Sequence, residues 1–478
     1  YVATISQSEK TGDPVLELPG FKIGKSGIEK SFDSKMRGRG AQRQVEVNAL
    51  GRIIRKLPGE ETQMGHDIEL TIDVSLQSFS TKRLAQGNSM YIPVDDPRIQ
   101  RALSEGRNLP PGTDPVNGYV NFDYKGSVQA PESGAAVVMD AFNGDVLALA
   151  STPGFDPNSF SSGLNAADWE NLLSNPRSPM TNKAVSGQYS PGSTFKMIVC
   201  LAALEAGVAH HETKVNCSGM IEFGDSRFHC WKKDGHGWLN MIDAIEQSCD
   251  VYLYELAKRV GIKRIGEMAA RFGFGEAFNF GLPGENRGLI PTPSWKRKTF
   301  GQAWHAGETL ITSIGQGFIL CTPLQLAVMT SRLVNGGRLV LPRLVKNERA
   351  EIQKRKSLQL SPQHLHTVLK GMDKVVNGSQ GTARRVVDQN MKFQFGGKSG
   401  SVQVKRISLD ERESGKLKNK DRPWRERDHA MFVAFAPLKS PRYVVSVVVE
   451  HGGGGSTMAA PIARDILAEA LRLNPSKL

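Results

Sequence analysis

Two groups of strand-like segments lie far apart in this chain, and their separation constrains the fold more than any other feature. Residues 135–151 (AAVVMDAFNGDVLALAS) are two apolar runs around Asn143-Gly144, a pair typical of a tight hairpin. The second group follows residue 394, in FGGKSGSVQV, HAMFVAFAP and RYVVSVVVEHGGGG, and a helical pattern at 458–473 closes the chain. Helical patterns dominate residues 165–335. This order predicts an α+β fold, in which helices pack on an antiparallel sheet beside an all-helical lobe.

The residues before the first hairpin predict a second, smaller domain. Residues 1–65 are rich in Gly, Lys and Arg, so we expect a small β-rich domain there and a larger one over 66–478. At the junction, 67–73 (DIELTID) alternates like a strand and 74–87 (VSLQSFSTKRLAQG) has helical spacing. Residues 88–130 carry Pro and Gly clusters and predict an extended insertion. The chain starts without Met inside a strand-like stretch, so we expect that an N-terminal portion has been removed.

The chain is basic, with 61 Lys and Arg residues against 48 Asp and Glu and a net charge of +13. Such an excess suits phospholipid head groups, cell-wall polymers or nucleic acid, or is simply a solvated surface. No nucleic-acid-binding signature accompanies it, so we expect no nucleic-acid partner. Residues 405–428 are a dense charge run that predicts a mobile, solvated loop between two strands. No run of about 18 apolar residues occurs, so no segment predicts a membrane span.

One serine and one lysine have the spacing of a nucleophile and its base. In SPGSTFKMIVCLAALEAG, Pro191-Gly192 predicts a turn, and we expect a helix to begin at Ser193 and end before Gly207. Ser193 and Lys196 then share a face of its first turn. A lysine can activate a serine hydroxyl if burial or a nearby cation lowers its pKa. The plainer alternative is an N-cap serine beside a surface lysine.

Two further short motifs follow Ser193 along the chain. Ser248 and Asp250 form an S-x-D motif just before a helical run, and Lys398 opens K-S-G on a strand-like segment. Both tripeptides also occur elsewhere in the chain by chance. For example, K-[ST]-G also starts at Lys10 and at Lys25, in segments that look like loops. The alternating strand after Lys398 separates that copy from the others.

The five cysteines cannot all pair, because their number is odd. Cys200 and Cys321 have apolar neighbours and are interpreted as small core residues. The others form a set with His236, listed in order as Cys217, Cys230, His236 and Cys249. Three sulfurs and an imidazole suit tetrahedral zinc, but the gaps of 12, 5 and 12 residues are not those of a zinc finger. A disulfide or unlinked core thiols remain open alternatives.

The ordered motifs S-x-x-K, S-x-[ND] and K-[ST]-G resemble those of penicillin-recognising serine acyltransferases. Together with SGAAVVMDAFNGDVLALASTPGFDPN, GETLITSIGQG, CTPLQLA and HGGGG, the chain resembles the class B penicillin-binding proteins of the elongation type, called penicillin-binding protein 2. The resemblance implies the penicillin-binding transpeptidase fold for 66–478 and a truncated, non-catalytic pedestal for 1–65. It also implies peptidoglycan D,D-transpeptidation during lateral wall elongation, through an acyl-enzyme that β-lactams also form.

The resemblance assigns a role to each motif residue. Ser193 would be the nucleophile, Lys196 the general base and Ser248 a proton relay. Asp250 stands where many relatives have Asn, although elongation-type members carry Asp. Lys398 would supply positive potential. The substrate-binding residues would be Ser399, Gly400 and Ser401: Ser399 would bind the terminal carboxylate, and the backbone N–H groups of Ser193 and Ser401 would form the oxyanion hole.

The resemblance also bears on the metal and on partners. It favours a closed, structural zinc site at Cys217, Cys230, His236 and Cys249, with His229 as a competing ligand. If so, Ser248 and Asp250 face the reaction pocket while Cys249 points away to the metal. The implied partners are peptidoglycan stem peptides, a membrane glycan polymerase of the shape, elongation, division and sporulation class, and a rod-shape scaffold protein. The implied location is the periplasmic face of the bacterial inner membrane, with the single N-terminal anchor absent from this chain.

Two other functions share the motifs. One is a β-lactamase or D,D-carboxypeptidase, which passes the acyl group to water. The other is a non-catalytic β-lactam sensor or scaffold. The N-terminal domain and the long helical insert argue against a compact β-lactamase, and the intact Ser193–Lys196 pair argues against a sensor.

Overall fold

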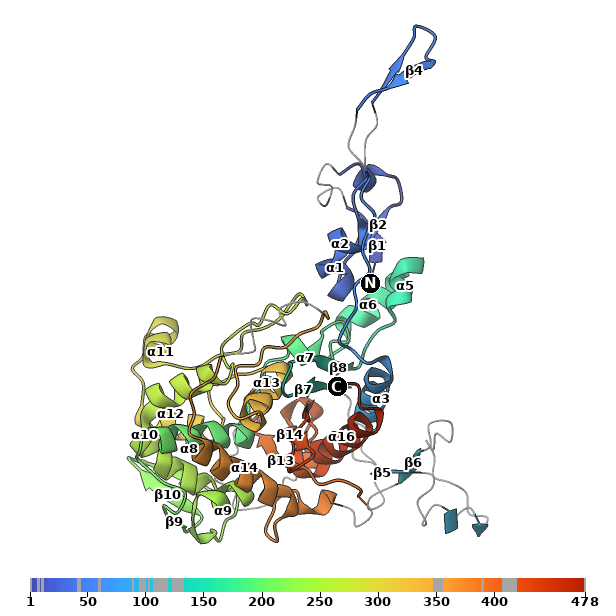
Figure 1. Ribbon diagram of the computed structural model, residues 1–478. Coiled ribbons are helices and arrows are strands. Elements are labelled where there is room, and N and C mark those ends of the chain that lie inside the picture. The colour runs from blue at the N-terminus through green and yellow to red at the C-terminus, as the bar shows by residue number, and fades with distance from the viewer. Residues whose placement is uncertain are drawn as a thin grey trace.

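The computed structural model describes most of the chain and places both strand groups in one sheet (Figure 1). The described residues are 2–6, 9, 13–40, 44–58, 62–87, 90–93, 100–101, 104–105, 119–122, 133–346, 356–387, 391–405 and 419–476. The central sheet has five strands in the order β13-β14-β15-β7-β8, and every pair is antiparallel. Its strands are β7 (Gly134–Asp140), β8 (Val146–Thr152), β13 (Gly396–Val402), β14 (His429–Ala436) and β15 (Tyr443–Val449). The predicted α+β fold is confirmed.

The sheet is the core of the larger domain because helices cover it on both sides. All seven residues of β15 are buried, which an antiparallel strand achieves only when both faces are covered. Helices α3 (Val74–Ala85) and α16 (Ala460–Leu473) contact each other and the sheet, and α13 (Pro323–Val334) also packs on its inner strands. A single wider turn, Gly455–Ala459, precedes α16. Both helices predicted at 74–87 and 458–473 are therefore confirmed.

The first hairpin turns at Asn143-Gly144, as its sequence predicts. Gly144 has φ +82°, and a Cβ there would lie 2.1 Å from the carbonyl oxygen of Leu341. Only glycine fits this position. The turn thereby packs closely on the strand-like segment at 341–345, where Asp145 also bridges to Arg343.

The lobe beside the sheet is mainly helical, but the prediction that it is all-helical was wrong. Its short strands β9 (Val215–Cys217), β10 (Met220–Phe223), β11 (Ser226–His229) and β12 (Gly237–Leu239) form two small antiparallel sheets. Strands of three or four residues are too short for a readable period, so tertiary pairing decides them. The helices from residue 157 to 377 are α5 (Pro157–Ser162), α6 (Ala166–Ser174), α7 (Lys183–Ser186), α8 (Lys196–Glu205), α9 (Met241–Glu246), α10 (Asp250–Arg271), α11 (Pro293–Phe300), α12 (Ala306–Ser313), α13 and α14 (Pro362–Asn377).

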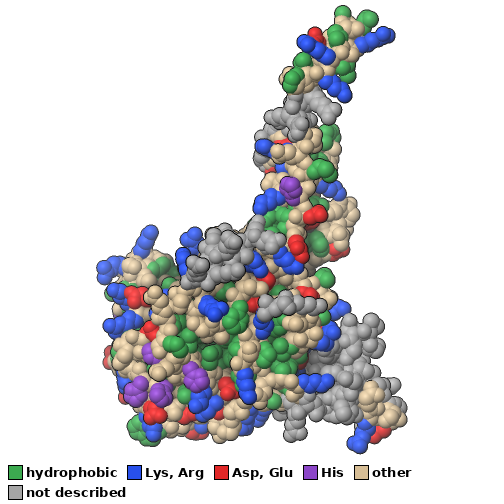
Figure 2. All heavy atoms as spheres, viewed as in Figure 1, with side chains coloured by type: hydrophobic (Ala, Val, Ile, Leu, Met, Phe, Trp, Pro, Cys, Tyr) green, Lys and Arg blue, Asp and Glu red, His purple; other side chains and the backbone are tan. Residues whose placement is uncertain are grey.

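The N-terminal region projects from this body as a narrow arm (Figures 1 and 2). It contains β1 (Val2–Thr4), β2 (Lys22–Gly24), α1 (Gly27–Ser31), α2 (Asp33–Arg37), β3 (Val45–Val47) and β4 (Ile53–Lys56). The β3–β4 hairpin forms the tip and carries exposed Lys and Arg side chains. The boundary between residues 65 and 66 stays a prediction.

The strand predicted at 67–73 was wrong. Leu70 forms only an isolated bridge with Val345, and the Thr71 hydroxyl donates to the carbonyl oxygen of Val146 at 2.7 Å. Asp73 instead caps α3 by accepting the backbone N–H of Leu76 at 2.8 Å. Its pairing with residues 344–346 is limited to that bridge and two flanking backbone hydrogen bonds, so alternation alone does not make it a strand.

Two predicted loops lie largely outside the described residues. Within 88–130 the structure describes the antiparallel pair β5 (Met90–Pro93) and β6 (Tyr119–Phe122), together with residues 100–101 and 104–105. Within 405–428 it describes Lys405 and residues from 419 onward. In the described part of the chain, no helix is both long enough and apolar enough to cross a bilayer.

Candidate active site

Ser193 lies on a tight turn that is pressed against β13. The turn is a 3-10 helix, Gly192–Phe195, and α8 starts only at Lys196, so the helix predicted to begin at Ser193 begins three residues later. The Gly192 N–H donates to the Gly315 carbonyl at 2.8 Å, and a Cβ on Gly192 would lie 2.8 Å from the side chain of Val402. This close packing against β13 tightens the first turn. Ser193 remains partly exposed and accessible to a substrate.

Lys196 is fully buried and makes three hydrogen bonds to the S-x-D motif. Its Nζ donates to the Ser248 carbonyl at 2.8 Å, to Ser248 Oγ at 3.2 Å and to Asp250 Oδ1 at 2.7 Å. A buried amino group requires such partners, because an unpaired polar group away from water is costly. These bonds fix the lysine beside the S-x-D motif, as the ordered motifs lead us to expect.

Ser248 connects the two lysines. It lies between α9 and α10 with φ +55°, a left-handed conformation that is rare for a residue other than glycine and is concentrated at functional sites. Its Oγ lies 3.2 Å from Lys196 Nζ and 3.0 Å from Lys398 Nζ. All three motifs therefore meet at one hydroxyl.

Lys398 reaches this hydroxyl from the outer strand of the sheet. It is fully buried on β13 and also donates to the Ser399 carbonyl at 3.0 Å. Burial lowers the pKa of Lys398 well below its ordinary value, and the nearby Lys196 lowers it further, while Asp250 opposes the shift. Burial also raises the pKa of Asp250, although Lys196 opposes this. Burial near Ser248 therefore favours the uncharged forms of both Lys398 and Asp250.

The rest of the K-S-G segment faces the Ser193 turn. A Cβ on Gly400 would lie 3.2 Å from the Pro191 carbonyl oxygen, so β13 passes directly behind the turn. Ser401 Oγ accepts the backbone N–H of Gly455 at 3.1 Å, and Ser399 Oγ lies 3.1 Å from Thr382 Oγ1. The structure brings Ser399, Gly400 and Ser401 to the same place as the other motif residues.

Three neighbours of the site were missed by sequence reasoning. Thr382 and Gly455 contact Ser399 and Ser401, and the backbone N–H of Trp231 donates to Asp250 Oδ2 at 2.9 Å. Each lies far from its partner in sequence and belongs to no spaced motif. The only signal was HGGGG at 451–455, because closely spaced glycines indicate close backbone approach.

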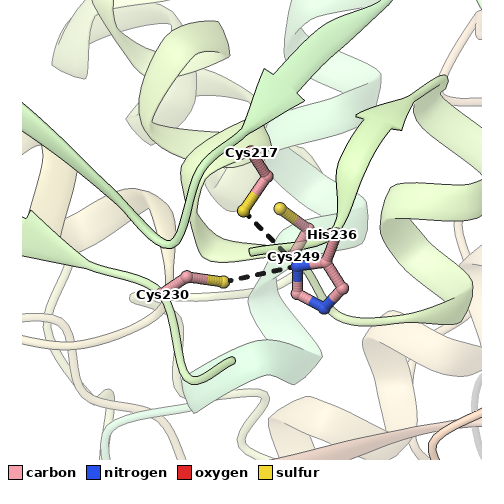
Figure 3. A group of neighbouring side chains, drawn as sticks. All are labelled: Cys217, Cys230, His236 and Cys249. Carbon is pink, nitrogen blue, oxygen red and sulfur yellow. Dashed lines mark hydrogen bonds between the residues drawn. The ribbon is translucent and has the colours of Figure 1, made fainter. Parts of the chain in front are cut away.

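The four predicted zinc ligands form a compact cluster next to this pocket (Figure 3). Their candidate ligand atoms all lie within 4.8 Å of one another. His236 Nδ1 is 3.4 Å from Cys217 Sγ and 3.6 Å from Cys230 Sγ. Tetrahedral zinc with ordinary Zn–S and Zn–N bonds separates such atoms by about 3.6 Å, so the donor set fits the ion in chemistry and spacing.

The three thiols of the cluster share their protons unequally. A hydrogen bond from Cys249 lowers the pKa of Cys217 to about 6 and that of Cys230 still further, while the same contacts raise the pKa of Cys249. All five cysteines lie in the described residues and are free thiols, and Cys200 and Cys321 are fully buried, as predicted. His229, the competing ligand, is not in the cluster that the described residues form.

Cys249 and its neighbours point in different directions. Its sulfur faces the cluster and accepts the Tyr252 N–H at 3.5 Å as the cap of α10, whereas Ser248 and Asp250 contact Lys196. The Asp250 backbone N–H donates to Cys230 Sγ at 3.4 Å. The cluster and the lysine pocket therefore share one segment of chain.

Two family models match the chain: the penicillin-binding protein transpeptidase domain over residues 134–468 and the penicillin-binding protein dimerisation domain over residues 1–70. The first covers most of the chain, including every motif residue described above. The chain belongs to the penicillin-binding protein transpeptidase family. The arm corresponds in position to the dimerisation domain of these penicillin-binding proteins.

Several similar curated proteins are named peptidoglycan D,D-transpeptidase MrdA. The chain is 32% identical to that of Acinetobacter baumannii over 476 residues, covering 97% of this chain and 63% of the relative. The Escherichia coli K12 relative is also 32% identical, over 93% of this chain and 64% of its own length. The chain thus spans less than two thirds of these relatives.

Solved penicillin-binding proteins share the fold. Pseudomonas aeruginosa PBP2 in complex with WCK 5153 has a TM-score of 0.75 and 32% identity, covering 98% of this chain and 88% of that one. Helicobacter pylori PBP2 in complex with MreC has a TM-score of 0.79 and 29% identity, covering 99% and 76%. The predicted penicillin-binding transpeptidase fold is confirmed.

Proposed function

We propose that this chain is a peptidoglycan D,D-transpeptidase that cross-links wall stem peptides during elongation. The observation that carries the proposal is the meeting of Lys196 and Lys398 at the Ser248 hydroxyl, with the Ser193 turn pressed against β13. This arrangement suits a serine that forms and then releases an acyl group. The names of the curated relatives support the same activity.

In the first half-reaction, Ser193 Oγ attacks the penultimate D-alanyl carbonyl of a donor stem peptide. Lys196 accepts the hydroxyl proton, and backbone N–H groups of Ser193 and Ser401 stabilise the oxyanion. Donors of this kind contribute roughly 3 kcal/mol each in other enzymes. The C–N bond then breaks, the terminal D-Ala takes up the proton and leaves as the amine, and an ester to Ser193 remains.

In the second half-reaction, the amine of an acceptor stem peptide attacks this ester. A C–N bond forms, the C–O bond to Ser193 breaks, and a proton passes from the amine through Ser248 to the serine oxygen. The donor's terminal carboxylate, which leaves with D-Ala in the first half-reaction, would be bound by Ser399 beside the buried Lys398, whose Nζ donates to the Ser399 carbonyl oxygen. The same site would be acylated by β-lactams.

The cysteine cluster would hold structural zinc through Cys217, Cys230, His236 and Cys249. Four protein ligands leave no open position on the ion. The zinc would therefore hold segments of the chain together and would take no part in the reaction. The shared segment at Cys249 and Asp250 would make zinc content a condition for an ordered lysine pocket.

The partner proposals extend those of the relatives. The Helicobacter pylori protein is described in complex with MreC, and another similar structure, with a TM-score of 0.74 and 30% identity, is described as a peptidoglycan synthase complex that coordinates polymerization and crosslinking. For this chain we propose a membrane glycan polymerase and a rod-shape scaffold protein as partners. The body would lie at the periplasmic face of the inner membrane.

Fluorescent penicillin and intact-mass spectrometry test the acyl transfer. We expect one covalent adduct per chain, lost in Ser193→Ala but kept in Ser31→Ala, a serine of a chance S-x-D motif. Rapid turnover of nitrocefin would favour the β-lactamase alternative, and an adduct without any cross-linked product from stem-peptide substrates would favour the sensor.

A further inference from the structure

Trp231 is a large apolar side chain that is exposed yet rigidly held. It is 59% exposed, although it follows the buried Cys230 directly. Its indole Nε1 donates to the carbonyl oxygens of Gln247 and Ser248, each at 3.1 Å, and its backbone N–H donates to Asp250 Oδ2 at 2.9 Å. Its polar edge is therefore satisfied by protein, and the exposed surface of the side chain is apolar ring.

The ring borders the pocket through Ser248. Nε1 contacts the same carbonyl oxygen that accepts a hydrogen bond from Lys196, and the hydroxyl of Ser248 contacts both buried lysines. On the other side, the ring of His236 lies at a centroid distance of 5.4 Å. Trp231 thus stands between the cysteine cluster and the serine that would relay the acceptor's proton.

We propose that the face of Trp231 is the subsite for the incoming acceptor, where it binds the aliphatic stem and primary amine of a second stem peptide. The inference rests on the proposed function and names the binding site for its second substrate. A transpeptidase must favour this amine over water as the attacking nucleophile. An amine held beside Ser248 is positioned to hand its proton to that residue, an advantage that free water lacks.

Charge explains why an aromatic ring suits this place. The acceptor amine arrives as an ammonium ion, while the chain has a net charge of +13. An added carboxylate would attract the amine but would also pair with Lys196 or Lys398. A tryptophan face attracts ammonium through its quadrupole and buries the alkyl chain without adding negative charge.

The step balances without any further reagent. The bound ammonium releases one proton to solvent and becomes the free amine. The amine attacks the ester carbonyl, the C–O bond to Ser193 breaks, and the second amine proton passes through Ser248 to the serine oxygen. The products are an amide and free Ser193.

The test measures how the acyl-enzyme divides between amine and water. A D-alanyl thioester is the donor and Nα-acetyl-lysinamide, which has one free amine on an alkyl chain, is the acceptor; amide and acid products are separated by chromatography. For Trp231→Leu we expect the amide-to-acid ratio to fall about fivefold, the size of a cation–π contact at an exposed site. Trp231→Tyr, which keeps a π face, should restore most of the ratio.

The matched control is Trp238→Leu, because Trp238 is 70% exposed on β12, where it pairs with Asn216. We expect its product ratio to equal that of the unaltered protein. An unchanged ratio in Trp231→Leu, or an equal fall in Trp238→Leu, would overturn the inference. If the unaltered protein forms neither a penicillin adduct nor either product, the proposed function fails instead.

Discussion

The backbone N–H of Asp250 donates to the sulfur of Cys230 at 3.4 Å, while the carboxylate of Asp250 accepts from Lys196 at 2.7 Å. One residue therefore touches both the cysteine cluster and the lysine pocket. Trp231, next to Cys230, donates to the other carboxylate oxygen. A substitution in the cysteine cluster should therefore shift the groups that hydrogen-bond to the buried carboxylate of Asp250.

Cys230→Ser should lower both metal content and penicillin acylation. A serine is a poor zinc ligand, and loosening the bonds to Asp250 leaves a buried charge less well satisfied, which costs about 1–3 kcal/mol or more. We expect zinc below about a tenth of an equivalent and acylation slowed roughly tenfold or more. Elemental analysis and fluorescent penicillin kinetics measure these quantities.

Cys321→Ala is the control for this change. Cys321 is also a fully buried free thiol, but it pairs with Tyr189 in an isolated β-bridge and is not part of the cluster. It should keep zinc and acylation even if it lowers stability. Normal acylation in a zinc-free Cys230→Ser protein would break the proposed link.

Lys398→Met should slow acylation without lowering the stability of the fold. Removing a buried amine whose pKa is lowered by burial is neutral or stabilising, whereas losing its contact with Ser248 should slow acylation by about 100-fold or more. The melting temperature should therefore stay level or rise. A large fall in melting temperature would show that Lys398 stabilises the fold.

The difference in folding stability between the unaltered protein and Lys398→Met should depend on pH. Unfolded Lys398 binds a proton below pH 10.5, whereas the folded residue stays neutral until far lower pH, so the unfolded state binds more protons in this window. The stability of the unaltered protein should rise relative to Lys398→Met as pH increases from 8 toward 10.5. Denaturant titrations across this range measure the difference, and parallel curves would contradict the lowered pKa.

His429 should make the sheet acid-sensitive. Its Nδ1 accepts the His451 N–H at 3.0 Å, and burial, with a smaller effect of His451, lowers its pKa to about 3. Since the unfolded residue titrates near 6.5, folding stability should fall as pH drops from 6.5 toward 3, by at most about 1.4 kcal/mol per pH unit. His429→Asn, which keeps an acceptor, should flatten the dependence measured by urea unfolding.

Gly455→Ala should disturb Ser401 specifically. A Cβ at Gly455 would lie 2.3 Å from the carbonyl oxygens of both Gly400 and Met431, so β13 or the glycine loop must shift. Overpacking of this kind costs about 1–3 kcal/mol, and we expect slower acylation as well. Gly454→Ala is the control, because its Cβ would meet only the movable hydroxyl of Thr457 at 2.8 Å. Equal acylation rates in the two variants would show that Gly455 does not position Ser401.

Short-range patterns predicted the parts of the site that depend on local spacing. The apolar runs around Asn143-Gly144 predicted the central hairpin, and the resemblance carried by the ordered motifs singled out Lys196, Ser248 and Lys398, which the structure brings into contact. These features are encoded by neighbouring residues or by a family signature. They needed no knowledge of the third dimension.

What was missed depends on contacts between distant segments. The strand predicted at 67–73 forms only a single bridge, between Leu70 and Val345, and the short strands around the cysteine cluster exist because they pair with each other. The left-handed conformation of Ser248 and the contact of Trp231 with Asp250 arise only when α9, α10 and the cluster come together. Alternation and spacing carry no information about such partners.

The position of β7 has a consequence for synthesis of the chain on the ribosome. β7 lies between β8 and β15, and Val137 pairs with Ser446 near the opposite end of the sequence. While the intervening helices are being translated, the β7–β8 hairpin exposes an apolar edge and both faces, which favours aggregation. We expect the nascent protein to need a chaperone until β15 emerges, and penicillin labelling of stalled chains to begin only after that strand has left the ribosome.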